Sequence, residues 1–179
     1  MAKYVAFLRA INVGGHTVTM PRLRAVFEAS GLSNVETFIA SGNVIFDTRA
    51  SAVSALERKI ATALHDALGY EVATFIRTIP ELAALAKYSP FDPSELEAEG
   101  NTLFISLLAA APTAEARRKL LALSTDIDAF HVAGREAFWL RRSKAGESKV
   151  TGALLERTLG MPGTARNANT IRRLASKYC

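Results

Sequence analysis

The first segment whose residue types could do chemistry is Arg9-Ala10-Ile11-Asn12-Val13-Gly14-Gly15. An arginine supplies a permanent positive charge, and an asparagine supplies both donors and an acceptor. Adjacent glycines let the backbone turn sharply and direct its N–H groups at an anion. The spacing matches neither of the glycine motifs that bind nucleotides. We therefore predict an anion-binding loop at Arg9, Asn12, Gly14 and Gly15, with a plain turn as the alternative.

A second polar segment is Ser41-Gly42-Asn43, which lies between two short apolar runs. Glycine and asparagine tolerate the positive φ angles of tight turns, so a β-hairpin turn explains this segment without any further role. Ligand binding by Ser41 and Asn43 is an additional hypothesis.

The third segment is Thr164-Ala165-Arg166-Asn167-Ala168-Asn169-Thr170, which precedes an apolar helical stripe. Threonine and asparagine are good helix N-caps, so capping explains part of it. An arginine at a helix start opposes the helix dipole, which suggests an anionic partner for Arg166. The unpaired N–H groups of the first helical turn also favour an anion. We therefore predict that Arg166 and Asn167 bind a ligand.

The charge of the chain is unevenly distributed. Residues 135–179 contain 10 Lys and Arg against 3 Asp and Glu, whereas residues 1–134 contain 12 against 14. This basic end indicates an anionic partner, a small molecule or a nucleic acid, with a merely solvated surface as the alternative. Arg172 and Arg173 flank the last apolar stripe and are the predicted nucleic-acid contacts. The wider basic set adds Arg141, Arg142, Lys144, Lys149 and Lys177.

Catalytic and metal signals are sparse, so the sequence leaves open whether the protein is an enzyme. His16, His65 and His131 lack metal-ligand spacing, and we expect no metal and no cofactor. His16 lies beside the glycine pair and could act as an acid or base there. No apolar run approaches the roughly 18–20 residues that span a bilayer. The only cysteine, Cys179, allows no internal disulfide, so we predict a cytoplasmic protein with no membrane contact and an undetermined oligomeric state.

The elements that must position these residues follow from hydrophobic periodicity and from turn residues. In the first part of the chain we predict strands at 3–8, 35–40, 44–46 and 71–77 and helices near 21–30 and 51–68. These elements follow one another in the order β-α-β-β-α-β, which is the ferredoxin-like order. In the second part of the chain we predict strands at 102–109, 127–132 and 137–141 and helices near 113–123 and 148–159. No closing strand is visible before the last helix.

The predicted fold class is therefore α+β, with two ferredoxin-like halves. The first half covers 1–79, a helix and an acidic connector cover 80–100, and the second half covers 101–179. We expect the second half to lack its closing strand and to end in basic helices.

Three segments together resemble the DUF1697 family of uncharacterised bacterial proteins: Phe7–Gly15, Ala40–Phe46 and Thr164–Thr170. The resemblance covers essentially the whole chain and implies two ferredoxin-like halves, but no established activity. The positions that it carries over are Arg9, Asn12, Gly14, Gly15, Ser41, Gly42, Asn43, Arg166, Asn167 and Thr170. Thr17 and Thr19 stand where the family often has basic residues, which weakens a phosphate role for that loop. Ala168 replaces a frequent aromatic residue, so stacking there is unsupported.

The leading functional hypothesis is binding of a phosphate-bearing small ligand or a nucleic acid. Arg9, Asn12 and the amides of the glycine pair would hold the anion from the first half, and Arg166 and Asn167 from the second. The alternatives are a small enzyme acting on an anionic substrate and a structural or interaction module.

Overall fold

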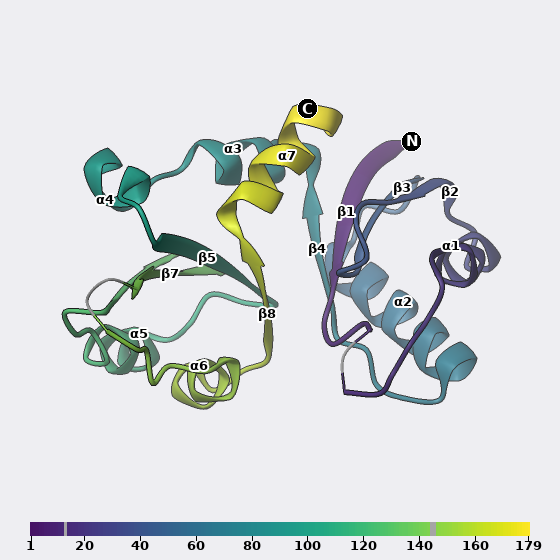
Figure 1. The fold of residues 1–179 in the computed structure, drawn as a ribbon. Coiled ribbons are helices and arrows are strands. Elements are labelled where there is room, and N and C mark those ends of the chain that lie inside the picture. The colour runs from purple at the N-terminus through teal and green to yellow at the C-terminus, as the bar shows by residue number, and fades with distance from the viewer. Residues whose placement is uncertain (13, 144–145) are drawn as a thin grey trace. The chain divides into compact units, whose positions relative to one another are not determined.

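The structure is a computed structural model that describes residues 1–12, 14–143 and 146–179. Val13 of the first polar segment and Lys144 of the basic set lie outside the described residues. Two compact units divide the chain: unit 1 comprises Met1–Ala83 and Leu174–Cys179, and unit 2 comprises Ala84–Arg173. The last six residues therefore belong to unit 1, which the periodicity did not predict. Each unit contains a four-stranded sheet with helices against one face (Figure 1).

Unit 1 has the β-α-β-β-α-β order that the sequence predicts. Its elements are β1 (Ala2–Leu8), α1 (Met20–Ala29), β2 (Ser33–Thr37), β3 (Asn43–Thr48), α2 (Val53–Leu68) and β4 (Thr74–Thr78), followed by the start of α3 (Ile79–Lys87). The strands pair antiparallel in the order β2-β3-β1-β4. Helix α2 forms because Leu56, Ile60 and Leu64 recur at helical spacing and are all buried. It ends at Gly69 in the left-handed conformation.

Unit 2 repeats this order. Its elements are the short α4 (Pro93–Glu97) within the acidic connector, then β5 (Asn101–Leu108), α5 (Ala114–Leu121), β6 (Asp128–Ala133), β7 (Glu136–Arg142), α6 (Gly152–Leu159), β8 (Gly163–Asn167) and α7 (Ala168–Tyr178). The sheet order is β6-β7-β5-β8, again antiparallel. The predicted cap at Thr113 is confirmed, because its side chain accepts the N–H of Ala116. The α+β class with two similar halves is thus confirmed.

The expectation that the second half lacks its closing strand was wrong. Strand β8 pairs with β5, with Gly163 opposite Leu108 and Arg166 opposite Ile105. Its side chains alternate between buried and exposed positions, as a strand requires. The alternation is hard to see in the sequence because the buried positions hold Thr164 and Arg166 instead of apolar residues.

The turn expected at Ser41-Gly42-Asn43 also differs from the structure. Strand β2 ends at Thr37, and the connection to β3 has five residues, 38–42. Positive φ angles occur at Ile39 (51°) and Gly42 (82°), whereas Asn43 is already the first residue of β3. The asparagine is therefore a buried strand residue, and only the glycine has the expected turn conformation.

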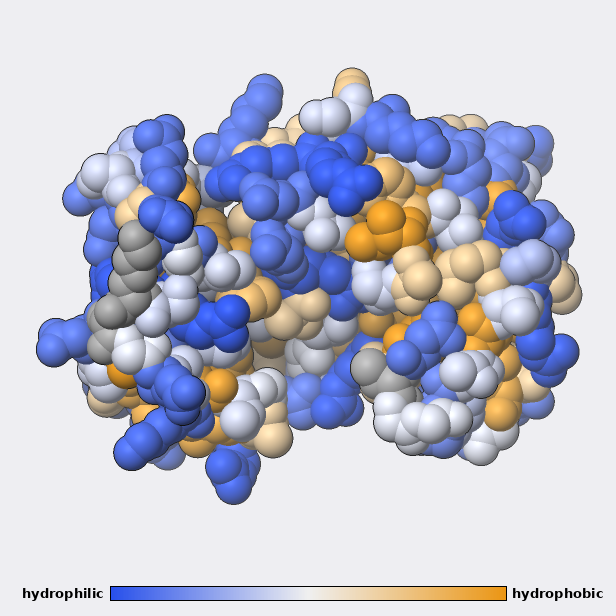
Figure 2. All heavy atoms as spheres, viewed as in Figure 1, coloured by the Kyte–Doolittle hydropathy of each residue, from blue (hydrophilic) through white to orange (hydrophobic). Residues whose placement is uncertain are grey.

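The core of unit 1 lies between its sheet and α1 and α2, and it includes Phe27, Phe46 and Leu64. The helix-side core of unit 2 includes Leu120, Phe130 and Leu155. On the face of the molecule in Figure 2, hydrophilic side chains surround smaller hydrophobic areas. Among the helices of the described residues, none has the length and apolar character needed to cross a membrane.

Candidate functional site

The first two predicted polar segments meet in unit 1. The side-chain carbonyl of Asn12 accepts the N–H of Val18 at 2.8 Å, and its amide donates to the carbonyl of Ala40 at 3.2 Å. The backbone N–H of Leu8 donates to the carbonyl of Gly42 at 2.8 Å. Asn12 therefore ties the loop after β1 to the loop between β2 and β3. Both functional groups of its amide have structural partners.

The two joined loops contain strained backbone. Ala10, Asn12 and Ile39 have φ angles of 59°, 60° and 51°. The left-handed backbone conformation costs about 1–2 kcal/mol for a residue other than glycine. Of these three residues, the β-branched Ile39 is the least suited to that conformation. Such strain persists only where surrounding contacts over-determine the conformation. The hydrogen bonds at Asn12 and Gly42 supply those contacts.

The remaining predicted residues of unit 1 divide between surface and interior. Arg9, Gly14, Gly15 and Ser41 are exposed, and both glycines have positive φ. Asn43 is fully buried, and its amide donates to the carbonyl of Phe38 and to the hydroxyl of Ser41, both at 3.0 Å. Asn43 thus holds the loop between β2 and β3 closed. Ligand binding at these positions stays a prediction.

His16 stacks on Tyr70, with ring centroids 4.0 Å apart. The ring contact gives the exposed histidine a packing role at the end of the loop. Within the described residues, no group of three or more His, Cys, Asp or Glu could hold a metal ion.

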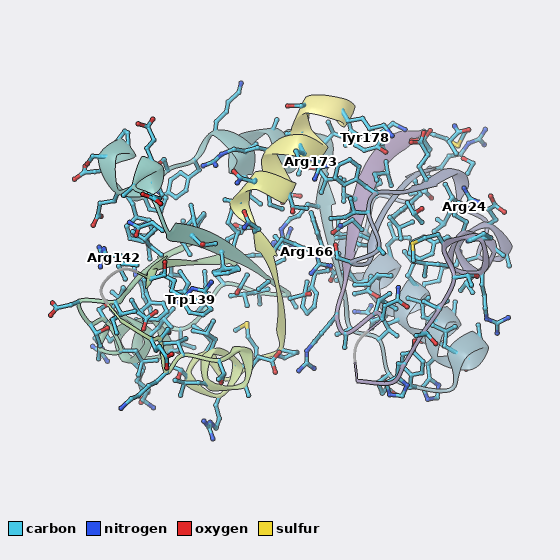
Figure 3. All side chains as sticks on the ribbon, viewed as in Figure 1. Arg24, Trp139, Arg142, Arg166, Arg173 and Tyr178 are labelled. Atoms are coloured by element: carbon cyan, nitrogen blue, oxygen red, sulfur yellow. The ribbon has the colours of Figure 1, made fainter. Side chains whose placement is uncertain are left out.

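Arg166 lies on β8 of unit 2 and not at a helix start (Figure 3). Its guanidinium Nη1 donates to Thr164 Oγ1 at 2.7 Å and to the carbonyl of Ala165 at 3.0 Å. Burial lowers the pKa of Arg166 to about 10. The prediction that Arg166 lies at a helix start and opposes the helix dipole was therefore wrong, because Arg166 lies in a strand.

Asn167 and Arg172 line one polar cavity in unit 2, here named the α7 notch. It has a volume of about 110 Å³ and lies where β8 ends and α7 begins. Strand β8 pairs with β5 only from Phe104 onward, so the edge of β5 at 101–103 continues past it and forms the other wall. The lining residues are Leu96, Asn101, Thr102, Leu103, Asn167, Ala168, Asn169 and Arg172.

The polar side chains of the α7 notch are hydrogen-bonded to one another and to the backbone of α7. Asn167 Oδ1 accepts the N–H of Asn169 at 2.9 Å, and Asn169 Oδ1 accepts Arg172 Nη1 at 3.0 Å. In the described parts of the chain the other guanidinium N–H groups of Arg172 make no hydrogen bond. The nearby carboxylate of Glu95 is paired with Arg142 at 2.6 Å. The notch therefore combines an arginine, amide groups and the positive end of an 11-residue helix.

A second cavity of unit 2, here named the aromatic cavity, has a volume of about 170 Å³ and lies between α6 and the sheet. Phe104 and Trp139 form its aromatic wall, with ring centroids 5.0 Å apart. The guanidinium of Arg141 lies 5.2 Å from the Phe104 ring centre and 5.9 Å from that of Trp139. The cavity persists because its other lining includes the small residues Ser106, Gly152, Gly163 and Ala165.

A buried carboxylate holds Trp139 in place. The indole N–H donates to Asp128 Oδ1 at 2.6 Å, and the hydroxyl of Ser148 donates to the same carboxylate at 2.8 Å. Asp128 is only 3% exposed. Figure 3 shows Trp139 on the side of the sheet nearer α5 and α6. The orientation of the indole is therefore set before any ligand binds.

The aromatic cavity was not predicted from the sequence. Phe104 and Trp139 are adjacent only because β5 pairs with β7 in the register that places them opposite each other. No local pattern in the sequence brings these two aromatic residues together. Of the predicted residues, Arg9, Asn12, Ser41 and Asn43 belong to unit 1, and Arg166 and Asn167 belong to unit 2.

Comparisons with known proteins agree with this architecture. The structure of a conserved bacterial protein, SP0830 from Streptococcus pneumoniae, is similar with a TM-score of 0.76 and 23% identity, over 98% of this chain and 97% of that one. At that identity the likeness concerns the fold. No curated protein matches the sequence. A family model described as "Protein of unknown function (DUF1697)" matches residues 1–138, and the chain therefore belongs to the DUF1697 family.

Proposed function

We propose that this protein binds a phosphate-bearing ligand, and that the α7 notch of unit 2 is the binding site. The observation that carries the proposal is the presence of Arg172, Asn167 and Asn169 around one small cavity at the start of α7. Phosphate groups are favoured at helix N-termini and by arginine, which can donate two parallel hydrogen bonds.

The charge distribution supports this site over the loop after β1. Residues 135–179 carry a net excess of seven positive charges, 10 against 3. In unit 1 the side chain of Asn12 is already bonded to Val18 and Ala40. Arg172 is exposed, and its guanidinium retains several N–H groups for a ligand.

We infer in addition that each unit is a ferredoxin-like half, which the β-α-β-β-α-β order and the antiparallel sheets support. We also infer a cytoplasmic location, because a single exposed cysteine suits a reducing compartment.

Calorimetric titration with inorganic phosphate and pyrophosphate tests the proposal. Arg172→Gln should weaken binding about tenfold or more, because it removes a charge-assisted hydrogen bond. Arg157→Gln, an exposed arginine of α6 outside the notch, is the matched control and should bind like the wild type. Equal affinities of the two variants, or no binding by the wild type, would exclude the notch as an anion site.

A nucleic acid is the other possible source of the phosphate, because Arg172 and Arg173 are both exposed. Fluorescence anisotropy with short oligonucleotides across a salt series separates the two sources. Each duplex phosphate neutralised steepens the log–log slope by about 0.9. A steep slope that flattens when both arginines are replaced by alanine would identify nucleic acid. Binding of small phosphates alone would restrict the ligand to a small molecule.

A further inference from the structure

We infer that the aromatic cavity of unit 2 is a second binding site, and that it takes a small uncharged aromatic compound with one hydroxyl group, such as a phenol. The cavity lies between α6 and the sheet, and none of its described lining residues also lines the α7 notch. The two sites therefore make independent predictions, and the failure of one leaves the other intact.

Strand pairing leaves a hollow beside an aromatic wall. Phe104 of β5 lies opposite Trp139 of β7, and the two rings form that wall. Next along the same face of β5, Ser106 lies between its direct partners, Ala137 of β7 and Ala165 of β8. Successive rows on one face of a sheet lie about 7 Å apart along the strand. A row of small side chains next to a row of rings thus leaves space beneath α6.

The cavity has room for a single aromatic ring. An apolar cavity of about 150 Å³ binds benzene, and this one has a volume of about 170 Å³. Helix α6 contributes Leu155 and Leu159 to the lining. Trp139 is held by its hydrogen bond to the buried Asp128, so the wall is in place before a ligand arrives. Aromatic rings pack favourably on such a wall, edge-to-face or offset-stacked.

Ser106 provides the observation that points to a ligand with a hydroxyl group. The residue lines the cavity and is only 7% exposed. Within the part of the chain that the structure describes, its hydroxyl makes no hydrogen bond. A buried hydroxyl in that state is disfavoured, and a ligand that pairs with it removes the penalty. Because a serine hydroxyl both donates and accepts, a phenolic hydroxyl is a complementary partner.

The lining favours an uncharged compound. Its described residues include no lysine, arginine or histidine, and their one charged side chain is that of Glu156. The carboxylate of Glu156 accepts the N–H of Gly163 at 3.4 Å. A ligand carboxylate would therefore lose its water next to another carboxylate, which is costly. Arg141, whose guanidinium lies 5.2 Å from the ring centre of Phe104, stands outside the lining.

Trp139 reports on the cavity directly, because it is the only tryptophan of the chain and gives a single indole N–H signal in an NMR spectrum. Titration with phenol should shift this signal to saturation. Phenol should bind about tenfold tighter than benzene, because one additional hydrogen bond is formed. Benzoate should bind more weakly than phenol, by about tenfold or more.

Replacement of Ser106 tests the hydroxyl group separately from the ring. Ser106→Ala should lower the affinity for phenol about tenfold, to that for benzene, and leave the affinity for benzene unchanged. Ser124→Ala, at an exposed serine of unit 2 outside the lining, is the matched control and should bind phenol like the wild type.

Filling the cavity tests the site itself. Because Ala165 is the direct partner of Ser106, Ala165→Leu at this exposed position should cover the hydroxyl and abolish binding of both phenol and benzene. Gly152→Leu acts from α6, where an added Cβ has no neighbour within 4 Å, and should have the same effect. Ala153→Leu, exposed on the same helix but outside the lining, is the control. Circular dichroism verifies that each variant is folded.

The outcomes decide this inference separately from the proposed function. Phenol binding that Arg172→Gln leaves unchanged and that Ala165→Leu abolishes supports the site. The absence of a saturable shift of the Trp139 signal would overturn it, whether or not inorganic phosphate binds the notch. Equal phenol affinities of Ser106→Ala and the wild type would overturn the role of the hydroxyl. Benzoate binding as tight as that of phenol would overturn the preference for an uncharged compound.

Discussion

The two halves share one topology but treat the helix-covered face of the sheet differently. In unit 1 the 16-residue α2 covers this face, and the core beneath it is continuous. In unit 2 the equivalent α6 has only eight residues, and small side chains beneath it leave the aromatic cavity. The same strand order can therefore serve as a solid core or as a binding site, depending on helix length and residue size.

Some residues of the two halves correspond when the helices and strands of each half are matched in chain order. Arg77 and Arg166 each occupy the fourth position of the closing strand, opposite Val5 and Ile105 respectively. Glu57 and Glu156 each occupy the fifth position of the second helix and accept a backbone N–H of the closing strand. The correspondence indicates that the two halves position their closing strands in the same way.

The largest expected difference between the halves concerns core packing. Leu64→Ala should lower the free energy of unfolding by about 4 kcal/mol, because Leu64 is fully buried in a continuous core. Leu155→Ala should lower it by only about 2 kcal/mol, because Leu155 already borders the aromatic cavity and loses fewer contacts. Urea denaturation of both variants measures the difference. Equal losses would mean that the cavity does not loosen the packing of α6.

The loops between the second and third strands provide the next comparison. At Gly42, φ is +82° and an added Cβ would lie 3.1 Å from Leu8 Cβ. Gly42→Ala should therefore destabilise the protein by about 3 kcal/mol, through left-handed strain and crowding together. At Gly134, φ is +54° but the nearest atom to an added Cβ is 3.7 Å away. Gly134→Ala should cost about 1 kcal/mol, from strain alone.

The unfolding midpoints of these two glycine variants in urea provide the measurement. A smaller effect at Gly42 than at Gly134 would show that the two joined loops of unit 1 relax around a methyl group.

A histidine next to a tyrosine occurs in each half, and the pair in unit 2 predicts a pH effect. His131 Nε2 lies 2.7 Å from the hydroxyl of Tyr88. Burial, and secondly the charge of Arg117, lower the pKa of His131 below its usual value of 6.5. Below about pH 6.5 the unfolded chain binds a proton that the folded chain does not. Stability should therefore fall as the pH drops through that value.

Titration of the His131 ring by NMR measures its pKa directly. Arg117→Gln should raise the pKa of His131 while leaving it below the usual value, because the effect of burial remains. Arg118→Gln, the exposed neighbour on α5, is the control and should have less effect. A pKa at or above the usual value in the wild type would contradict the burial of the ring.

The smallest expected effect concerns the end of α7, which belongs to unit 1. Glu36 accepts hydrogen bonds from the hydroxyl of Tyr178 at 2.9 Å and from Lys177 at 3.3 Å. These bonds, that of Tyr178 first, lower the pKa of Glu36. Their contribution to stability is present above the unfolded pKa and is lost as the pH falls through the folded pKa.

Tyr178→Phe should raise the pKa of Glu36 toward its usual value and reduce stability by less than about 1 kcal/mol, because the site is largely exposed. NMR titration of the Glu36 carboxyl group is the measurement. An unchanged pKa would show that Lys177 alone holds the carboxylate.

The positions of most elements could be predicted from the sequence, because local patterns determine them. The stripe of Leu56, Ile60 and Leu64 indicates α2, and Gly69 and Gly160 mark helix ends. Strand β8 could not be predicted, because its buried face carries Thr164 and Arg166. A buried arginine is stable there only through hydrogen bonds such as those to Thr164 and Ala165, which local sequence does not reveal.

The sequence by itself determined the α+β class, the repeated order of elements and the polar residues from which a site could be built. Only the tertiary structure decided which of them share a cavity. Asn167 and Arg172 meet at the α7 notch because β8 ends before the edge of β5 does. Phe104 and Trp139 meet because of strand register. Register and strand ends depend on contacts between residues far apart in the chain, and no local pattern encodes them.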